Sequence, residues 1–141
     1  MRTIWIPRRL TLSDILDVAY GRARVMISAV GIERMMASRR CIERLVEERR
    51  VVYGVNTGLG ALASKILTPE DAMSLQERIL LSHAVGWGPI AEPEVVRAAM
   101  FIRANMLARG YSGVRPEIVV LMCALLNDCL LYTSPSPRDR G

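Results

Sequence analysis

The chain has 141 residues and a formal net charge of +5, with 51% hydrophobic and 23% charged residues. This length allows one domain with its own core, and this balance is typical of a folded globular protein rather than a disordered one. The basic residues are nearly all arginine and alternate with acids along the chain, and only 5% of residues are aromatic. A nucleic-acid-binding surface gathers its basic residues and adds aromatic rings, so we expect no nucleic acid partner.

Cysteine and histidine usage argues against a metal site. Three cysteines, at positions 41, 123 and 129, and the single histidine, His83, show no metal-ligand or redox spacing. Cys41 and Cys123 lie in helical apolar patterns, so we expect both to be buried free thiols. The first ten residues lack the apolar segment of a signal peptide, and the longest apolar run, 118–126, is too short to cross a bilayer. We therefore expect a cytoplasmic protein with reduced thiols and no membrane partner.

Short extended segments and two helices are predicted in the first fifty residues. Residues 3–6 and 25–27 favour extended backbone. Between them, Ser13 is the predicted N-cap of a brief helix that Gly21 ends. Ser28 is the predicted N-cap of a long surface helix with one buried stripe, because apolar residues repeat at helical spacing at positions 32, 35, 36, 42, 45 and 46.

Three further helices are predicted to begin at prolines. Thr68 caps a helix that runs from Pro69 to about residue 83. Pro93 opens a helix that Gly110 stops, and Pro116 opens a last helix that is apolar from 118 to 126. The last two are apolar around more than one stripe, which is typical of helices in a bundle or at a subunit contact. The sequence predicts a mainly α fold with short extended segments.

The stretch from Tyr53 to Gly60 reads YGVNTGLG, with three glycines, an amide and a hydroxyl in eight residues. Glycine suits backbone that takes a positive φ or lies close against another group. Asn56 and Thr57 can hydrogen-bond the local backbone and hold such a loop in one shape. From residue types alone, two interpretations stay open: a glycine-rich turn with a packed tyrosine, or a loop that presents the Tyr53 phenol to a pocket.

Three segments in the same order resemble the aromatic amino acid ammonia-lyases, the family of histidine, phenylalanine and tyrosine ammonia-lyases. They are 53–60, 80–86 (LLSHAVG) and 103–115 (RANMLARGYSGVR). The similarity runs from about residue 10 to 127, and is closest to histidine ammonia-lyase. Leu59 departs from the phenylalanine expected there, which leaves the packing of the loop open. The resemblance implies that residues 1–128 are the N-terminal portion of a truncated ammonia-lyase domain, with a glycine-rich active-site loop.

The resemblance also implies roles for individual residues. Tyr53 would be the catalytic base that removes a β-proton from an amino acid substrate. His83 would contact the substrate side chain, although a lone histidine near the end of an apolar helix is more often structural. Asn56, Gly60 and Leu62 would shape the substrate pocket.

The histidine in the Ser82-His83 motif favours a polar substrate ring, because a neutral imidazole both donates and accepts hydrogen bonds. We expect histidine as substrate, giving urocanate and ammonia, with tyrosine second. Tyrosine or phenylalanine ammonia-lyases and aminomutases of the same family share Tyr53 and its loop, so they stay open. From a different class, a helical interaction module without catalysis, binding through the last two helices, also stays open.

The family's electrophile is a methylidene-imidazolone group that forms from an Ala-Ser-Gly tripeptide, and the chain contains no such tripeptide. In the family this tripeptide lies further along the polypeptide, so we expect the present fragment to be inactive alone. The resemblance implies a homotetramer for the full-length protein. Residues 129–141 resemble a translated sequencing adaptor, and we expect a non-native tail there, with a disordered natural tail as the alternative.

Overall fold

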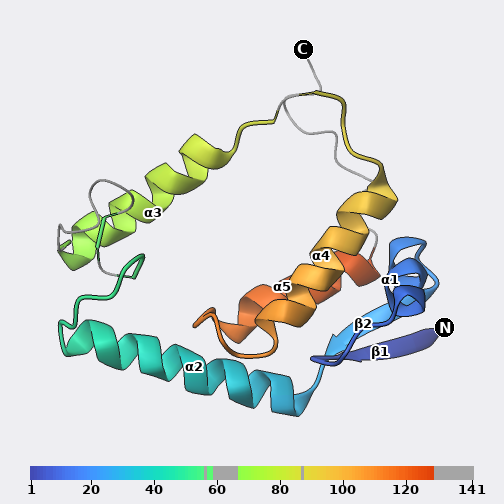
Figure 1. The fold of residues 1–141 in the computed structure, drawn as a ribbon, viewed down its shortest axis with the longest axis horizontal. Coiled ribbons are helices and arrows are strands. Elements are labelled where there is room, and N and C mark those ends of the chain that lie inside the picture. The colour runs from blue at the N-terminus through green and yellow to red at the C-terminus, as the bar shows by residue number, and fades with distance from the viewer. Residues whose placement is uncertain (56, 59–66, 87, 129–141) are drawn as a thin grey trace. The chain divides into compact units, whose positions relative to one another are not determined.

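The computed structural model describes residues 1–55, 57–58, 67–86 and 88–128 (Figure 1). The chain divides into two compact units, one made of Met1–Arg39 and the chain from Ile90 onward, the other of Arg40–Pro89. The described residues form a mainly α structure, as predicted, whose elements in order are β1 (Arg2–Ile6), α1 (Leu12–Ala19), β2 (Ala23–Ile27), α2 (Ala29–Glu47), α3 (Pro69–His83), α4 (Pro93–Leu107) and α5 (Pro116–Asn127).

The two extended segments pair as a parallel two-stranded sheet in the first unit. Parallel strands need a crossover connection, and α1 provides it. Ile4 on β1 lies opposite Val25 on β2, and every second side chain is buried, including Ile6 and Ala23. Both predicted extended segments are therefore confirmed, and the period-two alternation gives the sheet one apolar face.

The start of α1 differs from the prediction, because Thr11 and not Ser13 is its N-cap. The Thr11 hydroxyl accepts a hydrogen bond from the Asp14 amide at 3.2 Å, and the Asp14 carboxylate accepts one from the Thr11 amide at 3.0 Å. This reciprocal pair is a capping box, which needs an acceptor side chain three residues after the cap. Ser13 would have Leu16 at that position, so it cannot form the pair. The predicted end at Gly21 is confirmed, with φ of 69°.

Helices α4 and α5 pack together in the first unit, where α4 contacts α1 and α5 contacts β2 (Figure 1). Their predicted starts at Pro93 and Pro116 are confirmed. Each buries one face and leaves other apolar residues, such as Val95 and Leu121, exposed. The core of this unit joins both helices to the sheet, to α1 and to the first half of α2, and its largest apolar members are Ile4, Ile6, Val18, Val25, Met35, Phe101, Leu107, Val119 and Leu126.

Two asparagine side chains connect the C-terminal helices to the N-terminal segment. The Asn127 amide accepts from the Val25 backbone N–H and donates to the Val25 carbonyl, both at 2.8 Å. The Asn105 amide makes the same pair of bonds with Arg8, at 2.9 and 3.1 Å. Since Asn127 bonds the N–H and the carbonyl of one β2 residue, it replaces part of a third strand beside β2.

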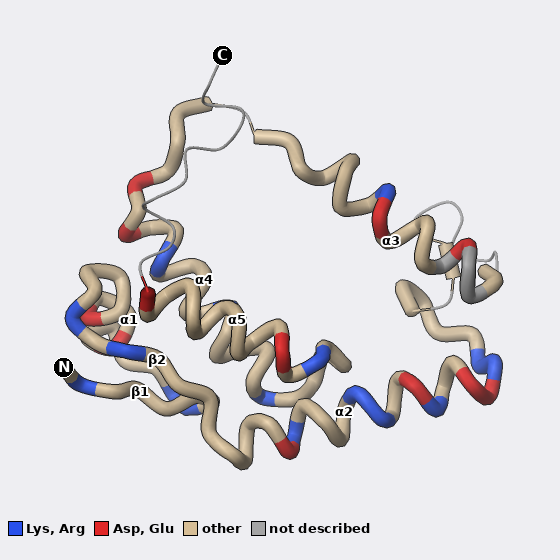
Figure 2. Tube along the Cα trace, turned by 180° about the vertical axis from the view of Figure 1, so that it is seen from behind, with Lys and Arg blue, Asp and Glu red and all other residues tan. Residues whose placement is uncertain are grey.

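The N-cap of α2 is Ser28, as predicted, because its hydroxyl accepts from the Gly31 amide at 3.2 Å. The predicted buried stripe is confined to the first half of the helix, where Gly31 and Met35 are buried. Cys41 in the second half is exposed, so its predicted burial is wrong. Cys123 is buried as predicted, and desolvation raises the pKa of its thiol to about 11. Figure 2 shows basic and acidic residues interleaved along α2.

Within the ranges that the structure describes, no helix combines the length and the apolar character needed to cross a membrane. The expected tail, residues 129–141, lies outside the described residues.

Candidate active site

The C-terminal end of α2 determines how the chain enters the glycine-rich loop. Arg49 takes a positive φ of 52°, and its amide donates to the Val46 carbonyl at 3.0 Å. The next amide, of Arg50, donates to the Leu45 carbonyl, also at 3.0 Å. These two bonds form a Schellman motif, which satisfies the last carbonyls of the helix and turns the chain away from its axis. Tyr53 follows three residues after this turn.

A second turn holds the described part of the loop. The Val55 amide donates to the Val52 carbonyl at 3.1 Å, and Gly54 takes a φ of 73°, which glycine adopts without strain. The buried hydroxyl of Thr57 accepts from the Gly54 amide at 3.3 Å and donates to the Gly58 carbonyl at 2.9 Å. Thr57 therefore holds the local backbone, as its residue type predicts.

Tyr53 lies at the start of this turn and is 64% exposed. No hydrogen bond to its phenol occurs among the described residues. Asn56, Gly60 and Leu62, the predicted pocket residues, lie outside the described residues. The structure therefore places Tyr53 on a hydrogen-bonded turn, and its pocket stays a prediction.

His83 is the last residue of α3 and is exposed. Thr68 caps the start of this helix as predicted, since its hydroxyl accepts from the Asp71 amide at 3.1 Å. The Nδ1 atom of His83 lies 2.9 Å from the Ile79 carbonyl oxygen and 3.1 Å from the Ser82 hydroxyl. The imidazole is thus folded back onto its own helix. Tyr53 and His83 belong to the same unit, and between these two described side chains there is no hydrogen bond.

Arg97 is a buried charge that the sequence analysis missed. Arg97 is only 3% exposed. Its guanidinium donates hydrogen bonds to the carbonyls of Val18, Ala19 and Leu126 at 2.9–3.2 Å. Its Nη1 atom is buried and has no partner among the described residues. The sequence feature that could have indicated its burial is its position one helical turn before Phe101 in an apolar helix. Its contacts are with helix ends, so its role is structural.

Neither a metal site among the described residues nor the tripeptide that forms a methylidene-imidazolone is found here. The described part of the chain contains no group of three or more histidine, cysteine or acidic side chains that is placed to hold a metal ion. The sequence contains no Ala-Ser-Gly, so these residues cannot form a methylidene-imidazolone group. Of the predicted site residues, the structure describes Tyr53 on a hydrogen-bonded turn and His83 in contact with its own helix.

Comparisons with known proteins agree on one family. The profile of the aromatic amino acid lyase family matches residues 10–132. The histidine ammonia-lyase of Streptomyces griseus is 45% identical over 117 residues, which are 83% of this chain and 23% of that protein. The histidine ammonia-lyase of Psychromonas ingrahamii is 39% identical over 135 residues, which are 96% of this chain and 26% of that protein.

The fold agrees as well. The structure of tyrosine aminomutase from Streptomyces globisporus superposes with a TM-score of 0.84 at 31% identity, covering 90% of this chain and 24% of that one. The chain spans about a quarter of the length of the curated relatives it matches. Since the family profile covers most of its length, the chain belongs to the aromatic amino acid lyase family, and the histidine ammonia-lyases that it matches are carbon–nitrogen lyases.

Proposed function

We propose that the full-length protein eliminates ammonia from L-histidine to give urocanate, with Tyr53 as the base and His83 as a contact to the substrate ring. The observation that carries the proposal is the 43–45% identity to histidine ammonia-lyases from Streptomyces over more than four fifths of this chain. Residues 1–128 would be the N-terminal portion of the lyase domain, and residues 129–141 would not belong to it.

The hydrogen-bonded turn at Tyr53 supports its role as the base. In the elimination, the base takes a proton from Cβ, the electrons of that bond form the Cα=Cβ double bond, and the Cα–N bond breaks to release ammonia. A free phenol loses its proton near pH 10, so a tyrosine base needs groups that stabilise its phenolate at neutral pH. Such a turn would bring the phenol to one position relative to the substrate, which favours efficient proton transfer.

The rest of the proposal concerns the parts that lie outside this chain. The methylidene-imidazolone group supplies an electrophile for the substrate amine, and it would form from an Ala-Ser-Gly elsewhere in the full-length polypeptide. The full-length protein would be a cytoplasmic homotetramer, and the fragment alone would be inactive. These features follow from the family resemblance, and the similarity to histidine ammonia-lyases supports an amino acid substrate.

A second candidate is an aminomutase or a lyase for tyrosine or phenylalanine. The superposition on tyrosine aminomutase, with a TM-score of 0.84, is the observation that supports this second candidate. An aminomutase returns a β-amino acid, whereas a lyase releases ammonia, so the products separate the two. A helical interaction module without catalysis would form neither a β-amino acid nor ammonia.

The test is the activity of the full-length protein and of its Tyr53→Phe variant. With L-histidine, the unchanged protein is expected to produce urocanate, seen by its ultraviolet absorbance, together with one ammonia per turnover. Tyr53→Phe keeps the ring and removes the hydroxyl, so kcat is expected to fall by on the order of 10²–10⁴-fold.

The matched control is Tyr20→Phe, which removes a phenol from the exposed end of α1. Its activity is expected to equal that of the unchanged protein. Urocanate production at the normal rate by Tyr53→Phe would refute the assignment of the base. A β-amino acid in place of urocanate from the unchanged protein would favour the aminomutase.

A further inference from the structure

Three polar atoms meet at the C-terminal end of α3. The Ser82 hydroxyl oxygen lies 3.0 Å from the Ile79 carbonyl oxygen, the His83 Nδ1 atom lies 2.9 Å from the same carbonyl oxygen, and the hydroxyl and Nδ1 are 3.1 Å apart. All three contacts are within hydrogen-bond distance. The groups come from one helical turn, so no other element is needed to bring them together.

The protons of this cluster can be assigned from the carbonyl. A carbonyl oxygen only accepts hydrogen bonds, and that of Ile79 also accepts the main-chain N–H of His83 within α3, so any side-chain atom that bonds it must donate. The Ser82 hydroxyl has one proton, which points to the Ile79 carbonyl. The Nδ1 atom must therefore have its own proton, and the free lone pair of the Ser82 oxygen faces that proton.

The opposite assignment is unfavourable. If the Ser82 hydroxyl donated to an unprotonated Nδ1, the lone pairs of Nδ1 and of the Ile79 carbonyl would face each other across 2.9 Å. Two acceptors at that distance repel, and the carbonyl would lose both side-chain hydrogen bonds and keep only the main-chain one. The neutral imidazole therefore has its proton on Nδ1, and its outer nitrogen, Nε2, has a free lone pair.

We propose that Ser82 and the Ile79 carbonyl are positioning groups that hold His83 as the Nδ1–H tautomer, so that Nε2 accepts a hydrogen bond from the substrate ring. A partner of such an acceptor must have a donor, as the imidazole N–H of histidine and the phenol O–H of tyrosine do. The unsubstituted ring of phenylalanine has none. The part that concerns the substrate rests on the proposed function, whereas the tautomer of His83 does not.

The tautomer can be measured directly, because His83 is the only histidine in the 141 residues. The chain is prepared with ¹⁵N-labelled histidine, and the two ring nitrogens are observed by NMR at a pH where the imidazole is neutral. The expected result is a protonated Nδ1 and an unprotonated Nε2. A ring that is mainly protonated on Nε2 would overturn the proposal.

Ser82→Ala removes the hydroxyl, and it is expected to shift the population toward the Nε2–H form. The matched control is Ser74→Ala, about two turns earlier on the same helix, which is expected to leave the ring signals unchanged. An unchanged tautomer in Ser82→Ala would overturn the role of Ser82. Equal shifts in both variants would overturn it as well, because the effect would then belong to the helix and not to the hydroxyl.

The second measurement uses the full-length protein. Ser82→Ala is expected to raise KM for histidine by up to about tenfold, the loss of one hydrogen bond, with a smaller change for phenylalanine and little change in kcat. An equal change for both substrates would overturn the claim about the substrate ring. If the full-length protein lacked lyase activity, the proposed function would fail and the NMR result on the tautomer would still stand or fall by itself.

Discussion

Asp14 is the buried carboxylate of the α1 capping box, and its surroundings favour the charged form. The backbone N–H of Thr11 lowers the pKa of Asp14 most, burial opposes this effect, and the Thr11 hydroxyl, Arg8 and Arg2 lower the pKa further, so that the pKa of Asp14 lies below its ordinary value. Arg2 lies 2.7 Å and Arg8 3.8 Å from this carboxylate. The charged side chain therefore satisfies a helix terminus and pairs with two cations.

This shift predicts how stability depends on pH. Since the folded-state pKa of Asp14 is lower than its unfolded-state value, Asp14 contributes stability that is fully present above the unfolded pKa and is lost as the pH falls through the folded pKa. Asp14→Asn should therefore destabilise the chain at neutral pH, and the difference from the unchanged chain should shrink in acid below about pH 4. Urea unfolding at a series of pH values measures this difference.

The matched control for that series is Asp128→Asn, at the exposed end of α5. It should change the stability little at any pH. A constant difference between Asp14→Asn and the unchanged chain, from neutral pH into acid, would contradict the prediction.

At the scale of single residues, the sequence predicted roles that depend on neighbours in the chain. Ser28, Thr68 and Gly21 have the functions expected from their positions, because a helix cap depends on the next three or four residues. The sequence pattern predicts Ser13 as a cap, but Thr11 takes that place because Asp14, three residues later, completes the capping box. Cys41 was expected to be buried because helical spacing shows which face is apolar, but not whether anything covers it.

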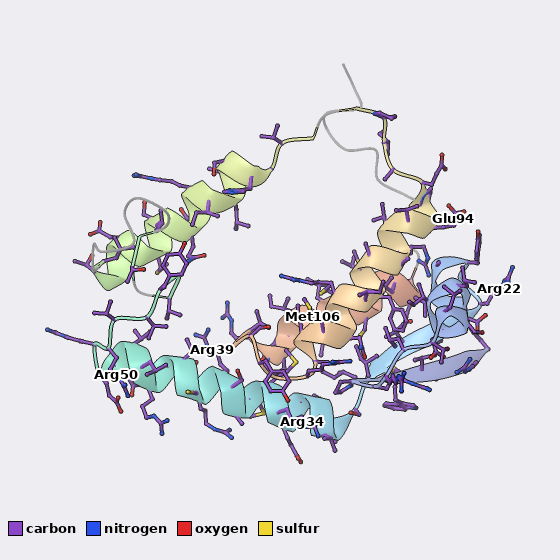
Figure 3. All side chains as sticks on the ribbon, in the orientation of Figure 1. Arg22, Arg34, Arg39, Arg50, Glu94 and Met106 are labelled. Carbon is purple, nitrogen blue, oxygen red and sulfur yellow. The ribbon has the colours of Figure 1, made fainter. Side chains whose placement is uncertain are left out.

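At the scale of elements, Gly110 connects α4 to the chain leading to α5. Its φ is 80°, and a Cβ at this position would lie 2.7 Å from the backbone C and O atoms of Arg34. Figure 3 labels Arg34 on α2, in the half of the helix that belongs to the first unit. A side chain at residue 110 would thus meet two obstacles, its own backbone conformation and the main chain of α2.

Gly21 separates these two effects. Its φ is 69°, but a Cβ there would meet nothing within 4 Å. Gly21→Ala should cost only the conformational term, about 1–2 kcal/mol. Gly110→Ala should cost at least about 1 kcal/mol more, because main-chain atoms of α2 must move. Urea unfolding followed by the circular dichroism of the helices measures both variants, and equal losses would show that α2 is not in contact with this turn in solution.

The elements themselves were largely predictable. The three prolines at 69, 93 and 116 each lie at the first helical residue, because the ring fixes φ and the missing N–H has no partner in the first turn. The parallel pairing of β1 with β2 could not be read from the local pattern, since pairing depends on contacts between segments that the sequence separates. The same limit applies to the candidate site: the motifs point to Tyr53 and His83, but the contact of His83 with the Ile79 carbonyl appears only in the folded helix.

At the scale of the whole molecule, the described structure is held by polar contacts that join distant segments. Asn127 bonds Val25 across 102 positions, and Arg97 bonds Val18 across 79. The sequence gives no sign of these contacts, because Asn127 and Arg97 bond main-chain groups: the amide and carbonyl of Val25, and the carbonyl of Val18. These contacts hold together the two segments of the first unit, which are separated in the sequence by the residues of the second unit.

Arg97 gives the last prediction. Its guanidinium satisfies the carbonyls of Val18 and Ala19 at the end of α1 and of Leu126 near the end of α5, where the helix dipoles favour a positive charge. An apolar replacement such as Arg97→Met removes the charge and takes the guanidinium donor from the carbonyls of Ala19 and Leu126, whereas the Val18 carbonyl keeps its bond from the Gly21 amide. Each unsatisfied buried group costs about 1–3 kcal/mol. The variant should therefore lose at least about 2 kcal/mol, even though the unpaired Nη1 is removed as well.

The control for this substitution is Arg103→Met on the exposed face of the same helix, which should change the unfolding free energy by less than about 0.5 kcal/mol. Both are measured by urea unfolding of the 141-residue chain. A replacement of a buried ion pair by apolar residues is often neutral, because both partners are removed together. Here the partners are main-chain carbonyls that no substitution removes, so equal stabilities of Arg97→Met and Arg103→Met would mean that water satisfies these helix ends as well as Arg97 does.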